Sequence, residues 1–407
     1  MDTSSVTAAK KMLDASIVTP TTDAIDVPLV TAANNKFALD LFKILYDGNQ
    51  NQNTFVSPFS ISVALAMTHL GAREETAQGM AKALRWETDD ETKLHEQFQA
   101  YVTQLQTPND QYQLSTANRI YIEKSYAVLD EFKNKTKKYY NAEPVSCDFK
   151  TDADNQRLHM NRWVSEQTQN RVNDLLAPGI VNEVTRMLIV NAIYFKGLWE
   201  RKFDEAKTKL SPFKVKPGLT KDVHMMSIKH EYSTTVSSEL GCTAVEIPYK
   251  GRKLSMVVIL PSEDFGLQNL VHTLTNEKLN SLLATLSSSK REVQLSLPKF
   301  EVTSSVELKE PLCTLGMAQA FDGSRANFTG ISSTPGLSLQ AAVHRAYVKV
   351  TEEGTEAAAA TSAAVVVAVC LRLPCVVNVD HPFMFLIREG GAGGNILFMG
   401  CVTDPSR

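Results

Sequence analysis

The sequence lacks the features that mark membrane-spanning and disulfide-rich proteins. No stretch reaches the roughly 18 consecutive apolar residues that span a bilayer, and the uncharged apolar run Ala363–Leu371 is too short. Residues 1–28 contain no apolar core of the roughly 7–15 residues that a secretory signal needs. The 6 cysteines are scattered and form no CxxC pair, so no disulfide framework is indicated. These absences favour a reducing compartment and predict a flexible N-terminal arm over residues 1–29.

An excess of charge of either sign is also missing. The formal net charge is −3, from 42 lysines and arginines against 45 aspartates and glutamates. This balance points to neither nucleic acid nor a membrane as a partner. One local cluster stands out, at Lys133, Lys135, Lys137 and Lys138. A solvated helix face is the simpler interpretation of this cluster, and a polyanion site is the alternative.

Motifs of catalysis and metal binding are largely absent. The chain contains no GxSxG nucleophile motif. His95-Glu96 begins like the HExxH zinc helix, but Gln99 stands where the second histidine is needed. The glycine-rich turn at 390–394 lacks the third glycine of GxGxxG and lies between two predicted strands rather than before a helix. The sequence therefore predicts no catalytic residue, no metal and no cofactor.

The first half of the chain is predicted to be mainly helical. Phe37, Leu41 and Leu45 fall on one helical face. Ser57 can cap a second helix that begins at Pro58. Ile61–Leu70 is apolar nearly all round, so this second helix should be buried.

The second half of the chain shifts toward strands. Val245–Pro248 and Leu254–Leu260 flank a short turn, which is a hairpin pattern. Phe383–Ile387 and Ile396–Met399 are continuously apolar and predict strands buried on both faces. With no repeat and no linker rich in Pro, Gly or Ser, the prediction is an α+β fold in one large domain.

A long uncharged segment precedes these last two strands. Ala357–Leu371 contains no charged residue in a chain whose charged content is 21%. Small residues fill its first half, and β-branched residues dominate the second. No proline falls between Gly354 and Leu373, so every backbone N–H of that segment can join a β-ladder.

Five motifs, in order along residues 30 to 405, together resemble the serpin family. They are NTFVSPFSISVALAMTHLG at 53–71, TANRIY at 116–121, LIVNAIYFKGLWERKF at 188–203, EEGTEAAAAT at 352–361 and VNVDHPFMFLI at 377–387. The resemblance implies a single domain over 30–407 with three β-sheets, about nine helices and an exposed reactive-centre loop at about 354–375. It also implies a suicide substrate: a serine protease cleaves the loop and becomes acylated, and the loop inserts into the central sheet.

The residues of the loop permit such an insertion. An inserted strand places alternate side chains in the core, and the inward set from Thr355 is Thr355, Ala357, Ala359, Thr361, Ala363 and Val365. None is large or charged, and a buried unpaired charge would cost several kcal/mol. The inhibitory hinge implied by the resemblance comprises Glu352, Glu353, Gly354, Thr355, Glu356, Ala357, Ala358, Ala359 and Ala360. Gly354 is the expected pivot because it tolerates backbone angles that other residues do not.

The family spacing from Gly354 places the reactive bond at Ala368–Val369. Small Ala368 suits the shallow pocket of an elastase-like protease. Arg372, followed by Leu373, would suit a trypsin-like pocket, and Leu371 a chymotrypsin-like or cysteine protease. Cys370 and Cys375 are expected to be free thiols, with a disulfide in an oxidising setting as the alternative.

The resemblance also implies a polar cluster beneath the part of the sheet that opens. Its matching residues are Ser57, Ser60, Asn191 and His344, with Trp199 near the point where the hinge enters. Buried polar groups of this kind must be paired, and such a network can exchange partners as the sheet parts.

Three functions remain open at this point. The first is an irreversible inhibitor of serine proteases, the second an inhibitor of papain-like cysteine proteases, and the third a non-inhibitory carrier or chaperone. The expected location is cytoplasmic, or extracellular by a route that needs no signal. The chain is expected to be a monomer that can polymerise if its loop enters the sheet of another molecule.

Overall fold

The computed structural model describes residues 28–407 except 51, 89, 108, 356–374 and 392. The described part contains nine α-helices: α2 Leu29–Gly48, α3 Pro58–His69, α4 Glu74–Ala83, α5 Glu91–Gln106, α6 Asp130–Tyr140, α7 Phe149–Gln167, α8 Leu267–Thr273, α9 Asn276–Ser287 and α10 Lys309–Leu312. Its strands are β1 Thr54–Val56, β2 Tyr112–Glu123, β3 Val145–Cys147, β4 Met187–Leu198, β5 Lys209–Lys216, β6 Leu219–Ser237, β7 Cys242–Pro248, β8 Leu254–Pro261, β9 Lys290–Pro298, β10 Phe300–Glu307, β11 Leu339–Thr351, β12 Gly354–Thr355, β13 Cys375–Asn378, β14 Phe383–Glu389 and β15 Ile396–Val402.

The central sheet has the strand order β10-β11-β12-β4-β2-β3. Its strands β11 and β4 are parallel and pair directly from Leu339↔Met187 to Tyr347↔Tyr194. At one end these two strands diverge, and the two-residue strand β12 lies between them, antiparallel to both. The central sheet is therefore closed along most of its length and open at one end.

The remaining strands form two further sheets that share β6. Ser233–Ser237 of this long strand pairs with β7, in the sheet that continues through β8, β14, β15 and β1. The preceding part of β6 pairs with β5 and β9, and β9 pairs with β13. One hydrogen-bonded strand thus passes from one sheet to the other, and the predicted total of three sheets is confirmed.

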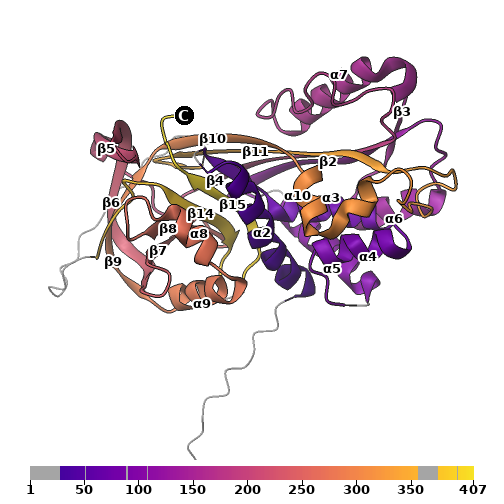
Figure 1. Ribbon diagram of the computed structural model, residues 1–407. Helices are drawn as coiled ribbons and strands as arrows, with labels where there is room; N and C mark the ends of the chain where they lie inside the picture. Colours follow the sequence, from indigo (N-terminus) through magenta and orange to yellow (C-terminus); the bar gives the residue numbers. More distant parts are fainter. Residues whose placement is uncertain (1–27, 51, 89, 108, 356–374, 392) are drawn as a thin grey trace, which may run out of the picture.

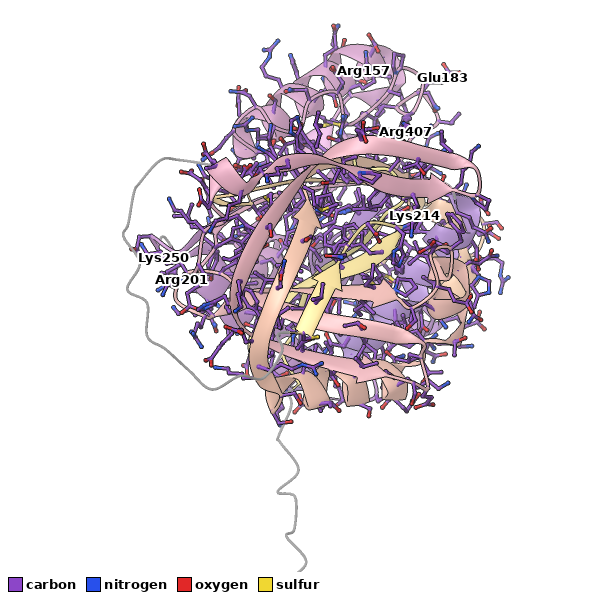
Figure 2. All side chains as sticks on the ribbon, turned by 90° about the vertical axis from the view of Figure 1, so that its left-hand side faces the viewer. Arg157, Glu183, Arg201, Lys214, Lys250 and Arg407 are labelled. Atoms are coloured by element: carbon purple, nitrogen blue, oxygen red, sulfur yellow. The ribbon has the colours of Figure 1, made fainter. Side chains whose placement is uncertain are left out.

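Two hydrophobic layers enclose the central sheet (Figure 1). Helix α3 contacts β2, β4 and β15, and all of its residues are buried, as its apolar sequence predicts. The opposite face is covered by α7, whose Met160 and Val164 pack with Tyr194 and Tyr347 of the sheet in a separate cluster. Figure 2 labels the exposed Glu183 and Lys250 together with Arg157 of α7, which is buried and donates to the carbonyl oxygen of Leu176 at 3.1 Å.

The elements predicted from the sequence are found close to their expected positions. Ser57 caps α3 by accepting a hydrogen bond from Ser60 N at 3.2 Å, with Pro58 as the first helical residue. The predicted hairpin is the antiparallel pair β7 and β8. The two apolar runs near the C-terminus are β14 and β15, which are neighbours in one sheet. The α+β class is confirmed.

Candidate functional site

The end of the central sheet where β11 and β4 diverge holds the start of the predicted hinge. Thr355 pairs with Val350 of β11 and with Gly197 of β4, and Gly354 pairs with Leu198. The side chain of Thr355 is fully buried. A short stretch of a strand antiparallel to both neighbours is therefore already present in the sheet.

Glycine is required at position 354 for two reasons. Its φ is +150°, a region that residues with a side chain rarely adopt. A Cβ atom at this position would also lie 2.1 Å from the carbonyl oxygen of Gly197. The tight turn into β12 thus depends on the absence of a side chain.

The two glutamates before Gly354 are fixed by partners from other elements. The Glu352 carboxylate accepts hydrogen bonds from Lys299 Nζ at 2.8 Å and from Thr208 Oγ1 at 2.7 Å. Burial raises the pKa of Glu352, but the hydrogen bonds from Lys299 and Thr208 outweigh it and hold this pKa below its ordinary value. Glu353 lies 3.4 Å from Lys202 Nζ. The start of the hinge is thus held by ion pairs as well as by backbone hydrogen bonds.

Trp199 and Tyr249 form the wall against which the hinge rests. Their rings stack with centroids 4.7 Å apart and planes 11° apart. Trp199 Nε1 donates to the carbonyl oxygen of Thr351 at 2.9 Å. The hydroxyl of Tyr249 lies 2.8 Å from Thr355 Oγ1, at hydrogen-bonding distance. The backbone N–H of Trp199 donates to the carbonyl oxygen of Glu353 at 3.0 Å, so Trp199 is both a core aromatic and a contact of the hinge.

Further along β4 and β11, five polar side chains form a network in which four are buried and Asn118 is partly exposed. Asn191 and His344 stand opposite one another in the parallel pair, and both are fully buried. Asn191 Nδ2 donates to Ser60 Oγ at 2.8 Å and also to Asn118 Oδ1 of β2. Ser57 Oγ donates to the carbonyl oxygen of Leu397 at 2.7 Å. The network thus connects the N-terminus of α3 to three strands of the central sheet.

The hydrogen bonds of His344 assign its tautomer. Its Nε2 accepts from Ser57 N at 3.1 Å, so the proton resides on Nδ1 and is donated to Asn191 Oδ1. Burial lowers the pKa of His344 to about 3, which keeps the imidazole neutral near pH 7. A neutral imidazole suits this position because it accepts on one side and donates on the other.

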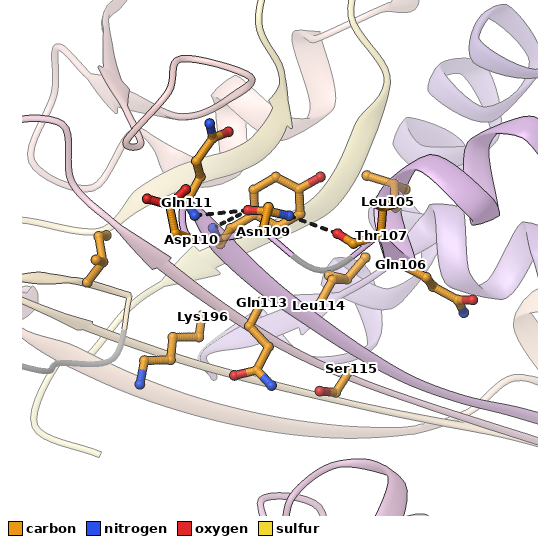
Figure 3. Close-up of a pocket in the computed structure, with 12 residues that line it drawn as sticks. Leu105, Gln106, Thr107, Asn109, Asp110, Gln111, Gln113, Leu114, Ser115 and Lys196 are labelled. Carbon is orange, nitrogen blue, oxygen red and sulfur yellow. Dashed lines mark hydrogen bonds between the residues drawn. The ribbon is translucent and has the colours of Figure 1, made fainter.

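A cavity of about 440 Å³ lies on the side of β4 away from the hinge (Figure 3). Its lining includes Leu198 and Lys196 of β4 and Gln113 of β2. Asn109 Oδ1 shapes one wall by accepting from the backbone N–H groups of Gln111 and Tyr112, both at 2.9 Å. Strands β4 and β2, which would have to move away from β11 for the sheet to open, therefore border this cavity.

The structure brings together the predicted network of Ser57, Ser60, Asn191 and His344, and it places Trp199 beside the hinge. The sequence motifs did not indicate Asn118, Tyr249 or Lys299 as site residues. Asn118 lies within the TANRIY motif beside the equally polar Thr116 and Arg119, so its polarity alone did not distinguish it. The rest of the hinge (Glu356, Ala357, Ala358, Ala359 and Ala360) and both sets of reactive-bond residues (Ala368 and Val369; Leu371, Arg372 and Leu373) lie outside the described residues.

The lysine cluster on α6 lies on an exposed helix face and has acidic neighbours. Lys133 pairs with Asp130, Lys135 with Glu131 and Lys137 with Glu143, at 2.9, 2.7 and 2.8 Å. These ion pairs agree with the simpler interpretation of a solvated helix face. In the described ranges, no three histidine, cysteine, aspartate or glutamate side chains gather as a metal site requires.

Comparisons with known proteins agree with this architecture. The sequence pattern of the family described as "Serpin (serine protease inhibitor)" matches residues 32–405. The leukocyte elastase inhibitor of Sus scrofa is 42% identical over 380 residues, which cover 92% of this chain and 99% of that protein. Serpin B6 of Macaca fascicularis is 38% identical over 378 residues, which cover 93% and 100%.

Solved structures show the same fold. Uncleaved ovalbumin superposes with a TM-score of 0.84 at 31% identity, covering 92% of this chain and 100% of that one. Serpin48 of the insect Tenebrio molitor superposes with a TM-score of 0.81 at 30% identity, covering 94% and 99%.

The α+β fold with a short hinge strand at the open end of its central sheet places the chain among the serpin-fold proteins. The chain belongs to the serpin family, serine protease inhibitors that act on target proteases. The resemblance drawn from its sequence motifs is confirmed.

Proposed function

We propose that this serpin is a suicide substrate that traps serine proteases by inserting its cleaved reactive loop between β11 and β4. The observation that carries the proposal is β12, which pairs with both strands in the orientation that an inserted strand would have. Insertion would replace one parallel pairing by two antiparallel ones, and antiparallel pairing is slightly more stable per residue.

The register of β12 supports the inward set predicted from the sequence. Thr355 stands opposite Gly197 and Val350, so a strand continuing in this register would bring Thr361 opposite both Asn191 and His344. A hydroxyl would then arrive where these two residues now bond to each other. The polar network would exchange one partner for another instead of losing one.

The elastase-like reactive bond Ala368–Val369 is part of the proposal. Its support is the small side chain of Ala368 and the 39–42% identity to proteins named leukocyte elastase inhibitor from Sus scrofa and Homo sapiens. Leu371, Arg372 and Leu373 define the alternative bonds. Trapping at these positions would point to chymotrypsin-like or trypsin-like targets.

The test is to incubate the full chain with elastase, trypsin, chymotrypsin and a papain-like protease. SDS-stable complexes are then measured, and the released C-terminal peptide is sequenced. We expect a complex with elastase and a peptide that begins at Val369. A complex with the papain-like protease would extend the targets to cysteine proteases. Cleavage without complex formation by every protease would contradict the proposal and favour a carrier or chaperone.

We also propose that the chain acts as a monomer in a reducing compartment such as the cytoplasm. The described cysteines (Cys147, Cys242, Cys313, Cys375 and Cys401) are all free thiols, and Cys370 lies outside the described residues. Among the described helices, none combines the length and apolar character that a bilayer crossing requires. Thiol alkylation without reductant should modify all six cysteines after unfolding, and size-exclusion chromatography should give a monomer. A Cys370–Cys375 disulfide or a stable oligomer would contradict this assignment.

A further inference from the structure

Thr355, a fully buried residue of the hinge, is held by a side chain from another sheet. Tyr249 lies in the turn between β7 and β8, and its hydroxyl lies 2.8 Å from Thr355 Oγ1. Both residues are fully buried. A hydrogen bond between two groups that water does not reach is costly to leave unmade, so this contact opposes withdrawal of Thr355 from the sheet.

Tyr249 itself has little freedom to follow the hinge outward. Its ring is stacked on Trp199 and meets Phe195 edge-on, with centroids 5.2 Å apart. Its backbone N–H donates to the carbonyl oxygen of Leu254 at 3.0 Å, and the next residue, Lys250, donates to Leu198 of β4 at 2.8 Å. Burial also raises the pKa of Tyr249 far above its ordinary value, so its hydroxyl stays protonated.

The strand that this contact secures is short. β12 has two residues, and each neighbouring strand pairs with it at only two positions. Strands this short are marginal by themselves, because few hydrogen bonds offset the ordering of the chain. The hydrogen bond of Tyr249 therefore adds to the few contacts that hold β12, beside the ion pairs of Glu352 and Glu353.

We infer that Tyr249 is a positioning residue that latches Thr355 into the central sheet before a protease arrives. Insertion of the cleaved loop then extends β12, which is already paired with β11 and β4. This inference rests on the proposed trapping function, because faster insertion matters only if it competes with release of the acylated protease. The latch itself is a property of the uncleaved protein and is measurable without a protease.

The test uses conservative variants that remove one hydroxyl at a time. Tyr249→Phe keeps the ring that stacks on Trp199, and Thr355→Val keeps the size of the hinge residue. Thr355→Ser keeps the hydroxyl at this position and removes only the methyl group. Tyr232→Phe is the matched control, because Tyr232 is also buried but its hydroxyl has no hydrogen-bond partner. The primary measurement is amide hydrogen exchange of the peptide that contains Gly354 and Thr355.

We expect exchange of this peptide to accelerate roughly 2- to 10-fold in Tyr249→Phe and in Thr355→Val, as the loss of one net hydrogen bond predicts. The double variant should exchange no faster than either single variant, and Thr355→Ser and Tyr232→Phe should match the unmodified protein. The same two hydroxyl deletions should increase the fraction of inhibitor that elastase cleaves without being trapped.

Unchanged exchange in Tyr249→Phe, or equal acceleration in Tyr232→Phe, would overturn the latch. Additive effects in the double variant would overturn it as well, because the two hydroxyls would then act separately. If the exchange results are as expected but the unmodified protein traps no protease, the latch stands and the proposed function is wrong.

Discussion

Two pairs of neighbouring strands in this serpin are held together in opposite ways. β14 and β15 are antiparallel and apolar along their paired centre, where Phe385 and Phe398 both stack on Phe55 with centroids 5.6 and 5.1 Å apart. β4 and β11 are parallel and meet at the buried polar pair Asn191 and His344. Separating packed apolar side chains loses their contacts without replacement. Separating a hydrogen-bonded pair costs little free energy if each group finds a new hydrogen-bond partner. This difference supports our proposal that β4 and β11 are the strands that separate when the loop inserts.

The largest effect is expected from a charge at the start of the inserting strand. Thr355 is fully buried between β11 and β4, so Thr355→Arg would require an unpaired cation inside the sheet, at several kcal/mol. We expect elastase to cleave this variant at an ordinary rate without forming an SDS-stable complex. Val236→Arg is the control, because Val236 is 62% exposed on β6. Complexes at the normal rate with Thr355→Arg would contradict insertion in this register.

The second prediction compares the two strand pairs directly. Phe385→Ala should lower the free energy of unfolding by about 3–5 kcal/mol through lost packing, while the ratio of trapped to cleaved inhibitor stays unchanged. Asn191→Ala leaves several buried groups without partners, at about 1–3 kcal/mol each, and should in addition accelerate spontaneous loop insertion and polymerisation on mild heating. Urea unfolding, complex formation and native gel electrophoresis separate these outcomes. Equal effects of both variants on trapping would remove the distinction between the pairs.

The sequence predicted the local parts of this site better than its contacts. The Ser57 cap and the buried helix α3 follow from neighbouring residues, which is why they were found without a structure. Asn118 and Tyr249 were missed because their partners lie 73 and 106 residues away. Alternation along a strand tells which face a residue occupies, but the register between distant strands decides which residue it meets. Lys299 was missed for the same reason. It lies directly before β10, whereas its partner Glu352 lies directly after β11.

The smallest effect at neutral pH should come from protonation of the polar network, which acts only in acid. The folded-state pKa of His344 is about 3, below the roughly 6.5 of an unfolded histidine. Between these two values His344 is protonated in the unfolded chain and neutral in the folded protein. Above about pH 6.5 this group contributes no pH dependence, and as pH falls from 6.5 toward 3 it destabilises the folded state by up to about 1.4 kcal/mol per pH unit. His344→Gln should therefore flatten the dependence of the urea midpoint on pH between about 6 and 4, even if the variant is less stable throughout. An unaltered slope in His344→Gln would show that His344 is already charged in the folded state, and the assigned tautomer would then be wrong.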